Sequence, residues 1–228
     1  MNTKRNSQSG FSLIELVIAM SVTIVIATIA STLVAQSFRM RAREDTRSDA
    51  IADAQRALNI VTREIANSGF GLMDNGIVPA DSGPAAIRFR ANLNAYTRDA
   101  AGVAVAGSEG VKDRDEDIKY LMYNDNANNR HYLVRYDAYI GTTVGQREAT
   151  TVLANRLDSF QLQYFDSAGT ELNVAANPDL LRDAWKVRLT VGVILPAEGA
   201  PESPGYQPET TINLVSDVVL RNASQITF

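Results

Sequence analysis

The sequence Gly10-Phe11-Ser12-Leu13-Ile14-Glu15-Leu16 opens a long apolar run. From Leu13 to Ala35 the only charged side chain is Glu15, and neither proline nor glycine interrupts the run. A helix of about 23 residues, rising about 1.5 Å per residue, is long enough to cross the hydrocarbon core of a bilayer. A carboxylate inside such a segment is costly. The sequence therefore predicts a membrane helix with an acidic residue near its start that needs a physical explanation.

Two interpretations of this segment need no partner. The first is a secretory signal peptide with a basic start at Lys4 and Arg5, but the apolar run exceeds the usual length of about 7–15 residues and lacks a small-residue cleavage site. The second is a plain signal anchor in which Ser12 and Glu15 form a capping box, and the acid also suits the positive end of the helix dipole. The anchor is physically sound, but it leaves the Gly10-Phe11 step unexplained.

The third interpretation, which we favour, is a resemblance. The basic leader, Gly10, Phe11, Glu15 and the long apolar run closely resemble the class III signal of type IV prepilins and pseudopilins. The resemblance implies that a prepilin peptidase cleaves after Gly10 and that the new terminal Phe11 is N-methylated. It also implies that Glu15 docks the subunit into a growing filament. A buried carboxylate is much less costly beside an opposite charge, and the freed amine of Phe11 would supply one.

The charges that flank the run favour the opposite orientation. Lys4 and Arg5 precede it, whereas the basic residues that follow it closely are Arg39, Arg41, Arg43 and Arg47. Positive charge alone would place the C-terminal part in the cytoplasm. We nevertheless expect one membrane pass with that part in the bacterial periplasm, because the resemblance requires the Gly10-Phe11 bond to face the cytoplasm.

The chain after the membrane segment continues without proline or glycine as far as Gly69. Residues 36–50 are polar and charged, and an apolar stripe at helical spacing follows. This stripe is either a coiled-coil seam or, as we favour, a face that packs on the chain's own sheet. Asn67-Ser68-Gly69 predicts the helix end, with Gly69 as the C-terminal cap. The members of the stripe are Ile51, Ala54, Leu58, Val61 and Ile65.

The remaining chain has the alternating pattern and turn residues of strands. We therefore divide the protein into a cleaved leader (1–10), a transmembrane half (11–35) and an amphipathic half (36–68) of one helix, and a β-rich globular domain (69–228). The expected class is α+β, a pilin-like long N-terminal helix packed on a mainly antiparallel sheet. The loops expected at residues 91–110 and 196–208 are candidate contact surfaces. Strands are expected at 87–90, 118–123, 131–139, 151–154, 159–165, 185–195 and 210–220, the second and third as a hairpin.

The C-terminal half carries a second, weaker resemblance. Phe160 and Tyr164, then Asp166 and Gly169, then Trp185-Lys186-Val187-Arg188-Leu189, and finally Leu220-Arg221-Asn222 occur in the order found in the minor pilins called PilW and the pseudopilins called GspJ. This implies a minor pilin that helps to initiate assembly and can be located at the filament tip. The alternatives are a minor pseudopilin of type II secretion and a membrane-anchored binding domain that never polymerises. The absence of the proline that major pilins carry in the membrane half fits a low-copy subunit.

Composition and motifs argue against other functions. The net charge of −4 and the pI near 5.1 do not suit a nucleic-acid partner, and the chain has no cysteine for disulfides or thiolate metal sites. Asp113, Asp115 and Asp117 alternate as in a calcium loop, but Ile118 replaces the required glycine, so we expect a solvated acidic turn and no metal. His131 is the only histidine. We expect no cofactor and no enzyme activity; the expected partners are prepilin peptidase, other minor and major pilins, the inner-membrane assembly platform and the lipid bilayer.

Overall fold

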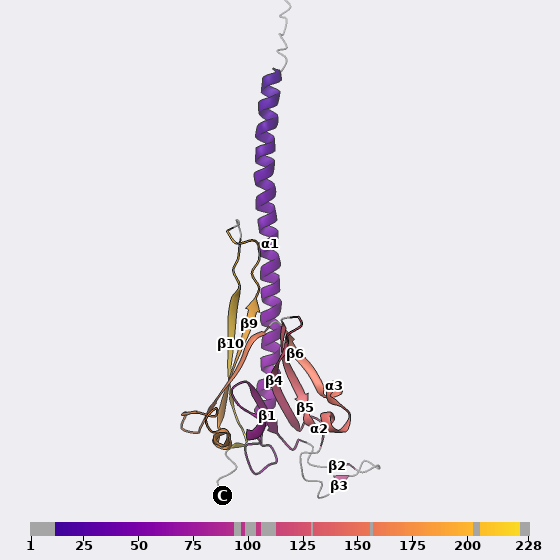
Figure 1. Ribbon diagram of the computed structural model, residues 1–228, viewed down its shortest axis with the longest axis vertical. Helices are drawn as coiled ribbons and strands as arrows, with labels where there is room; N and C mark the ends of the chain where they lie inside the picture. The colour runs from indigo at the N-terminus through magenta and orange to yellow at the C-terminus, as the bar shows by residue number, and fades with distance from the viewer. Residues whose placement is uncertain are drawn as a thin grey trace, which may run out of the picture. The chain divides into compact units, whose positions relative to one another are not determined.

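A computed structural model describes residues 12–93, 97–98, 104–105, 113–128, 130–155, 157–202 and 206–223. The chain divides into two compact units, and each is considered by itself. One unit contains residues 1–45 and 198–207, and the other contains 46–197 and 208–228. A single helix, α1 (Leu13–Ile65), runs through both units without a break (Figure 1). The predicted long N-terminal helix is therefore confirmed.

Helix α1 ends as the sequence predicts, at a left-handed glycine. Ser68 donates its backbone N–H to the Ile65 carbonyl at 2.9 Å, and Gly69 adopts a φ of 77° that favours glycine. The Gly69 N–H then bonds to the Arg90 carbonyl at 2.9 Å, which ties the helix end to the first strand. The backbone at Gly76 passes very close to the helix end. A Cβ atom at Gly76 would lie 2.3 Å from the Gly69 nitrogen, so a larger residue does not fit there.

The globular part contains two four-stranded sheets, where the sequence led us to expect one. The first has the order β1-β4-β5-β6 and the second the order β10-β9-β7-β8, while β2 and β3 form a separate pair. Every pairing is antiparallel. The α+β class, helix first and antiparallel sheets after it, is confirmed. The strands are β1 (Ala86–Arg90), β2 (Thr97–Arg98), β3 (Ala104–Val105), β4 (Asp117–Asp125), β5 (Arg130–Asp137), β6 (Thr150–Asn155), β7 (Leu157–Phe165), β8 (Glu171–Leu172), β9 (Lys186–Leu195) and β10 (Thr210–Val219).

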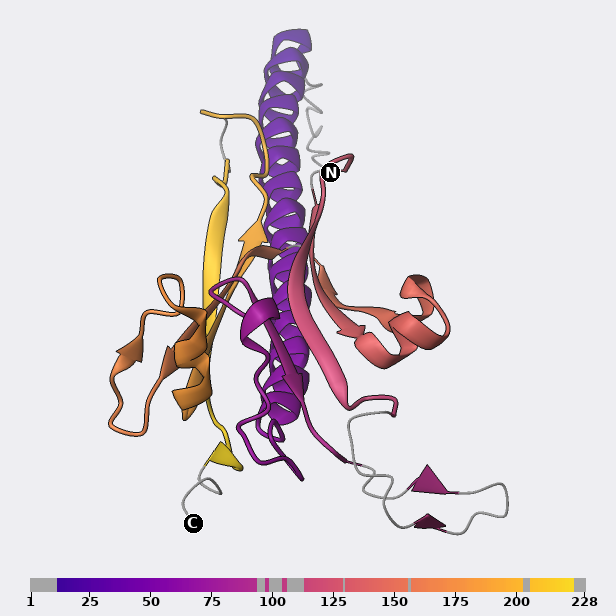
Figure 2. The same ribbon diagram turned by 60° about the horizontal axis from the view of Figure 1, so that its bottom comes forward.

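The core forms where the C-terminal part of α1 meets both sheets. In Figures 1 and 2 this part of the helix has one sheet on each side. Buried residues of the helix belong to the same apolar cluster as Tyr120 and Leu133 of the first sheet and Phe160 and Leu189 of the second. The apolar stripe thus packs within its own domain, as favoured over a coiled-coil seam. Of its predicted members, Ala54, Leu58, Val61 and Ile65 are buried and Ile51 is half-buried, while Ala50 and Ala57 are buried beside them.

Short helices that the sequence pattern did not indicate lie before the first strand and between later strands. These are α2 (Ala138–Thr143), α3 (Gln146–Ala149) and the 3-10 helices η1 (Pro79–Asp81) and η2 (Pro178–Asp183). The strand expected to reach residue 139 stops at Asp137, because the Asp137 carboxylate accepts the Ile140 N–H at 3.1 Å and caps α2. The expected 91–110 loop contains β2 and β3, and most of its other residues lie outside the described part of the chain.

Candidate membrane and assembly segment

The N-terminal part of α1 exposes an uninterrupted apolar surface. Every residue from Ser12 to Ala35 is exposed, including Leu13, Ile24 and Leu33 at 79%, 63% and 58%. By length and composition, α1 is the one described helix that is apolar enough to cross a membrane. Soluble proteins rarely expose a continuous apolar surface of this size, which normally marks contact with lipid or with other proteins. These properties support membrane anchoring.

Glu15 lies in the first turn of α1, and its side chain is exposed. Its carboxylate accepts the Ser12 backbone N–H at 3.2 Å, and the Ser12 carbonyl accepts the Leu16 N–H at 3.2 Å. One of the two reciprocal bonds of the expected capping box is therefore present; the Ser12 hydroxyl makes no bond to the described residues. Gly10 and Phe11, the expected cleavage and methylation residues, lie outside the described residues.

The hydroxyl groups within the apolar run are satisfied inside the helix. Ser21, Thr23, Thr28 and Ser31 each donate to the carbonyl four residues earlier at 2.8 Å, and Thr32 donates to the Ile29 carbonyl at 2.8 Å. An unpaired hydroxyl in lipid would be costly. The Glu15 carboxylate differs from these hydroxyl groups. It offers about four acceptor positions, and only one hydrogen bond to a described residue, from the Ser12 N–H, uses them.

A partly buried polar contact fixes the C-terminal part of α1 to the first sheet. One oxygen of Glu64 accepts both the Tyr120 hydroxyl at 2.6 Å and the Arg135 Nε at 3.0 Å. Arg135 also donates to Asp115 at 2.7 Å. Burial, with the negative charge of Glu64 beside it, raises the pKa of Tyr120 far above its usual value. Sequence inspection missed Glu64: its only signal was a position on the helix between the buried Val61 and Ile65.

The last residues of β10 and their continuation meet the helix end. Leu220 is fully buried, and the Arg221 N–H lies 3.4 Å from the Ala66 carbonyl. The Asn222 side chain donates to the Ser68 carbonyl at 3.1 Å. The strands that carry the second resemblance, β7, β9 and β10, are neighbours in one sheet. Leu220-Arg221-Asn222 therefore connects this sheet to the end of α1.

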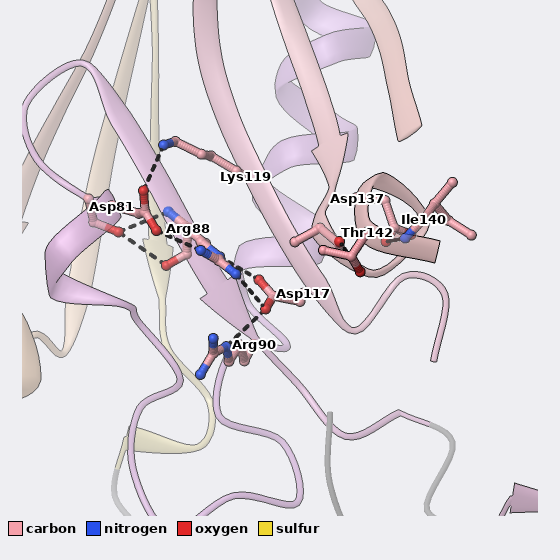
Figure 3. Close-up of polar contacts among 10 residues, drawn as sticks. Asp81, Arg88, Arg90, Asp117, Lys119, Asp137, Ile140 and Thr142 are labelled. Carbon is pink, nitrogen blue, oxygen red and sulfur yellow. Dashed lines mark hydrogen bonds and ion pairs between the residues drawn. The ribbon is translucent and has the colours of Figure 1, made fainter. Parts of the chain in front are cut away.

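The acidic segment 113–117 is a structural network and not the solvated turn that we expected. Glu116 and Asp117 are 1% and 8% exposed. Figure 3 shows Asp117 held by two arginines of β1: Arg88 donates to both of its oxygens, at 2.7 and 2.9 Å, and Arg90 donates at 3.0 Å. Arginine and carboxylate pair here in two parallel bonds. Both oxygens of Asp117 are therefore already bound by arginine.

The same network extends to Asp81 beside the first strand. Asp81 accepts Lys119 at 3.0 Å and Arg88 at 2.6 Å, and these two bonds lower the pKa of its carboxyl group. Among the described residues, no three His, Cys, Asp or Glu side chains are placed to hold a metal ion. His131, the second residue of β5, is half-buried, and its Nδ1 atom lies 2.8 Å from the Asn124 side-chain oxygen. None of these groups forms a site for chemistry, so the N-terminal segment is the candidate site.

Comparison with known proteins agrees with this choice. Residues 5–31 match the family model described as the prokaryotic N-terminal methylation motif. No curated protein matches the chain. The matched residues include Gly10, Phe11 and Glu15 and most of the exposed apolar surface of α1. The chain thus carries a prepilin-type N-terminal motif on a long helix joined to an antiparallel β domain, which supports a pilin or a pseudopilin.

Proposed function

We propose that the protein is a minor pilin of a type IV pilus system, structural and not enzymatic, that helps to initiate filament assembly and is positioned at or near the tip. Prepilin peptidase removes residues 1–10, and the new terminal Phe11 is N-methylated. The observation that carries the proposal is the match of residues 5–31 to the methylation motif on a helix that is exposed at every described position of its apolar part.

Glu15 is proposed to guide the subunit into the filament. It is exposed, and its only hydrogen bond to a described residue is to its own helix, the Ser12 N–H. The local bond and the helix dipole lower the cost of the charge while the subunit waits in the membrane. In the filament, the Phe11 amine of the same or a neighbouring subunit would pair with it in a medium where such a pair is strong.

The proposed location follows from the same motif. A peptidase on the cytoplasmic side of the inner membrane requires the Gly10-Phe11 bond on that side, so the domain after the single pass lies in the periplasm and later in the filament. The apolar part of α1 contacts the bilayer, the assembly platform and other pilins in turn. Strands β7 and β9, which carry parts of the resemblance to PilW and GspJ, lie in one sheet with β10. This arrangement supports the assignment to the PilW/GspJ type of minor pilin.

Mass spectrometry of the protein purified from its own membrane tests the processing step. The expected mature chain begins at N-methylated Phe11, and Gly10→Ser abolishes both cleavage and entry into filaments. Ser9→Ala, one residue upstream, is the matched control and is processed normally. Recovery of a native chain that retains residues 1–10 would contradict the proposal. Loss of surface pili in a deletion strain supports a pilus subunit, whereas loss of protein secretion with normal pili identifies a type II pseudopilin.

A further inference from the structure

Strand β10 is a long sheet edge that the described chain leaves open. It pairs with β9 over its whole length, from Thr210↔Leu195 to Val219↔Lys186, with no register shift. No described strand lies on its other side. The Leu220 N–H bonds to the Trp185 carbonyl at 2.9 Å, which fixes the alternation along the pair. The backbone N–H and C=O groups of Thr211, Asn213, Val215, Asp217 and Val219 consequently point away from β9.

The other edges of the two sheets are short, irregular or covered. β1 is covered by the preceding loop: the Val78 N–H bonds to the Arg88 carbonyl at 2.8 Å, and the Arg90 N–H bonds to the Gly76 carbonyl at 2.8 Å. β8 has two residues, and the pairing of β6 with β5 contains a register shift. Among the edges that the structure describes, β10 alone is long, regular and open.

The sequence of β10 also lacks the usual protection of an exposed edge. Proteins block such edges with lysine, proline, bulges or inward charges. β10 (TTINLVSDVV) contains no lysine, proline or glycine, and its one charge, Asp217, is bound by Arg188 at 2.7 and 2.9 Å. Val215 and Val219 are 59% and 48% exposed on the outer face. An unprotected edge with exposed β-branched residues is suited to pair with another strand.

We propose that β10 accepts an added β-strand from a different subunit of the same assembly, and that this strand is extended, neutral and rich in β-branched residues. The uncharged edge and the neutralised Asp217 favour a neutral strand. A second copy related by a twofold axis does not fit: β10 and α1 end side by side at the Arg221–Ala66 bond, so antiparallel pairing of two β10 edges would point the two α1 helices in opposite directions. Subunits of one filament share a single direction, so the proposed assembly does not offer this pairing.

Residue-resolved hydrogen exchange compares the purified full chain with the assembled filament. This test rests on the proposed function, because it needs the assembly. In the isolated chain we expect the amides of Asn213, Val215 and Asp217 to exchange rapidly and those of Leu214 and Ser216 slowly. In the assembly the first group becomes protected by at least about tenfold. The proposal is overturned if those amides stay fast in the assembly, or if they are already protected in the isolated chain by its own residues.

A proline variant supplies the second measurement. Val215→Pro removes one outward N–H without touching the β9 ladder, since edge positions that face away from a neighbour accept proline. The matched control Val215→Thr keeps the N–H and the branched shape. We expect Val215→Pro to reduce recovery in sheared filaments at least about tenfold, while Val215→Thr stays within twofold. Equal recovery of both variants refutes strand addition but leaves the pilin proposal standing; an unprocessed native chain refutes the pilin proposal itself.

Discussion

Removal of the Glu64 carboxylate tests how α1 is held by the domain. Glu64→Ala takes away the only acceptor that a described residue offers to the Tyr120 hydroxyl, which lies 2.6 Å from Glu64. Tyr120 is 0% exposed, and Glu64→Ala leaves its hydroxyl without a partner among the described residues. Arg135 loses one of its two carboxylates and keeps Asp115 at 2.7 Å. The variant therefore leaves one buried hydroxyl unpaired and one arginine half-paired.

The expected loss of stability follows from these two effects. A buried hydroxyl without a partner costs about 1–3 kcal/mol. The weakened ion pair adds about 1 kcal/mol, because the Glu64 and Arg135 side chains are 25% and 15% exposed and are partly screened. A total of about 3 kcal/mol lowers the melting temperature of a domain of this size by roughly 6–12 °C. Tyr120→Phe, which removes the hydroxyl and leaves the Glu64–Arg135 pair, costs about 1 kcal/mol.

Thermal and denaturant unfolding of the full chain in detergent measures these changes. Glu209→Ala is the matched control: Glu209 is exposed, and its side chain makes no hydrogen bond or ion pair with a described residue. It should change the free energy of unfolding by less than about 0.5 kcal/mol. The Glu64→Ala/Tyr120→Phe double variant should lose about 1 kcal/mol less free energy of unfolding than the two single variants lose together, because no hydroxyl remains unpaired. Small and additive losses would refute the contact between helix and sheet.

Three further predictions concern the membrane segment, a buried amide and alkaline pH. Glu15→Ala should leave processing and membrane insertion intact and reduce recovery of the subunit in filaments; recovery equal to the native chain would contradict the docking role. Asn75→Ala should cost about 3 kcal/mol, against less than about 0.5 kcal/mol for exposed Asn59→Ala, because the buried Asn75 amide donates to the Leu181 carbonyl at 2.7 Å and accepts the Ile77 N–H at 3.1 Å. Burial raises the pKa of Tyr120 and Tyr164 above 10.0 in the folded state, so the unfolded chain releases these protons first. Stability should be constant up to about pH 10 and then fall by about 1.4 kcal/mol per pH unit for each tyrosine; denaturant titrations from pH 9 to 11.5 check this, and a slope unchanged in Tyr120→Phe would contradict it.

Local sequence signals predicted the elements of the fold well. The uninterrupted run from Leu13 and the glycine at position 69 correctly bounded α1, because helix length and a left-handed cap depend on nearby residues. The alternation in Ile87–Arg90 and the Asn-rich turn before His131 correctly indicated β1 and the β4–β5 hairpin. Asp137 was the informative failure. Its strand-like neighbourhood suggested continuation to residue 139, but its carboxylate caps α2 instead.

What the sequence alone determined about function is the N-terminal motif, because cleavage, methylation and membrane crossing depend on residue types at fixed spacing along one helix. Only the tertiary structure decided which acidic side chains are bound by other residues of the chain and which sheet edge is left unpaired. Asp117 is bound by Arg88 of another strand, and Glu64 by Tyr120 and Arg135, all far away in the chain. The open edge of β10 likewise depends on which strands lie beside it. Such pairings arise from packing between distant segments, and no local pattern of residues encodes them.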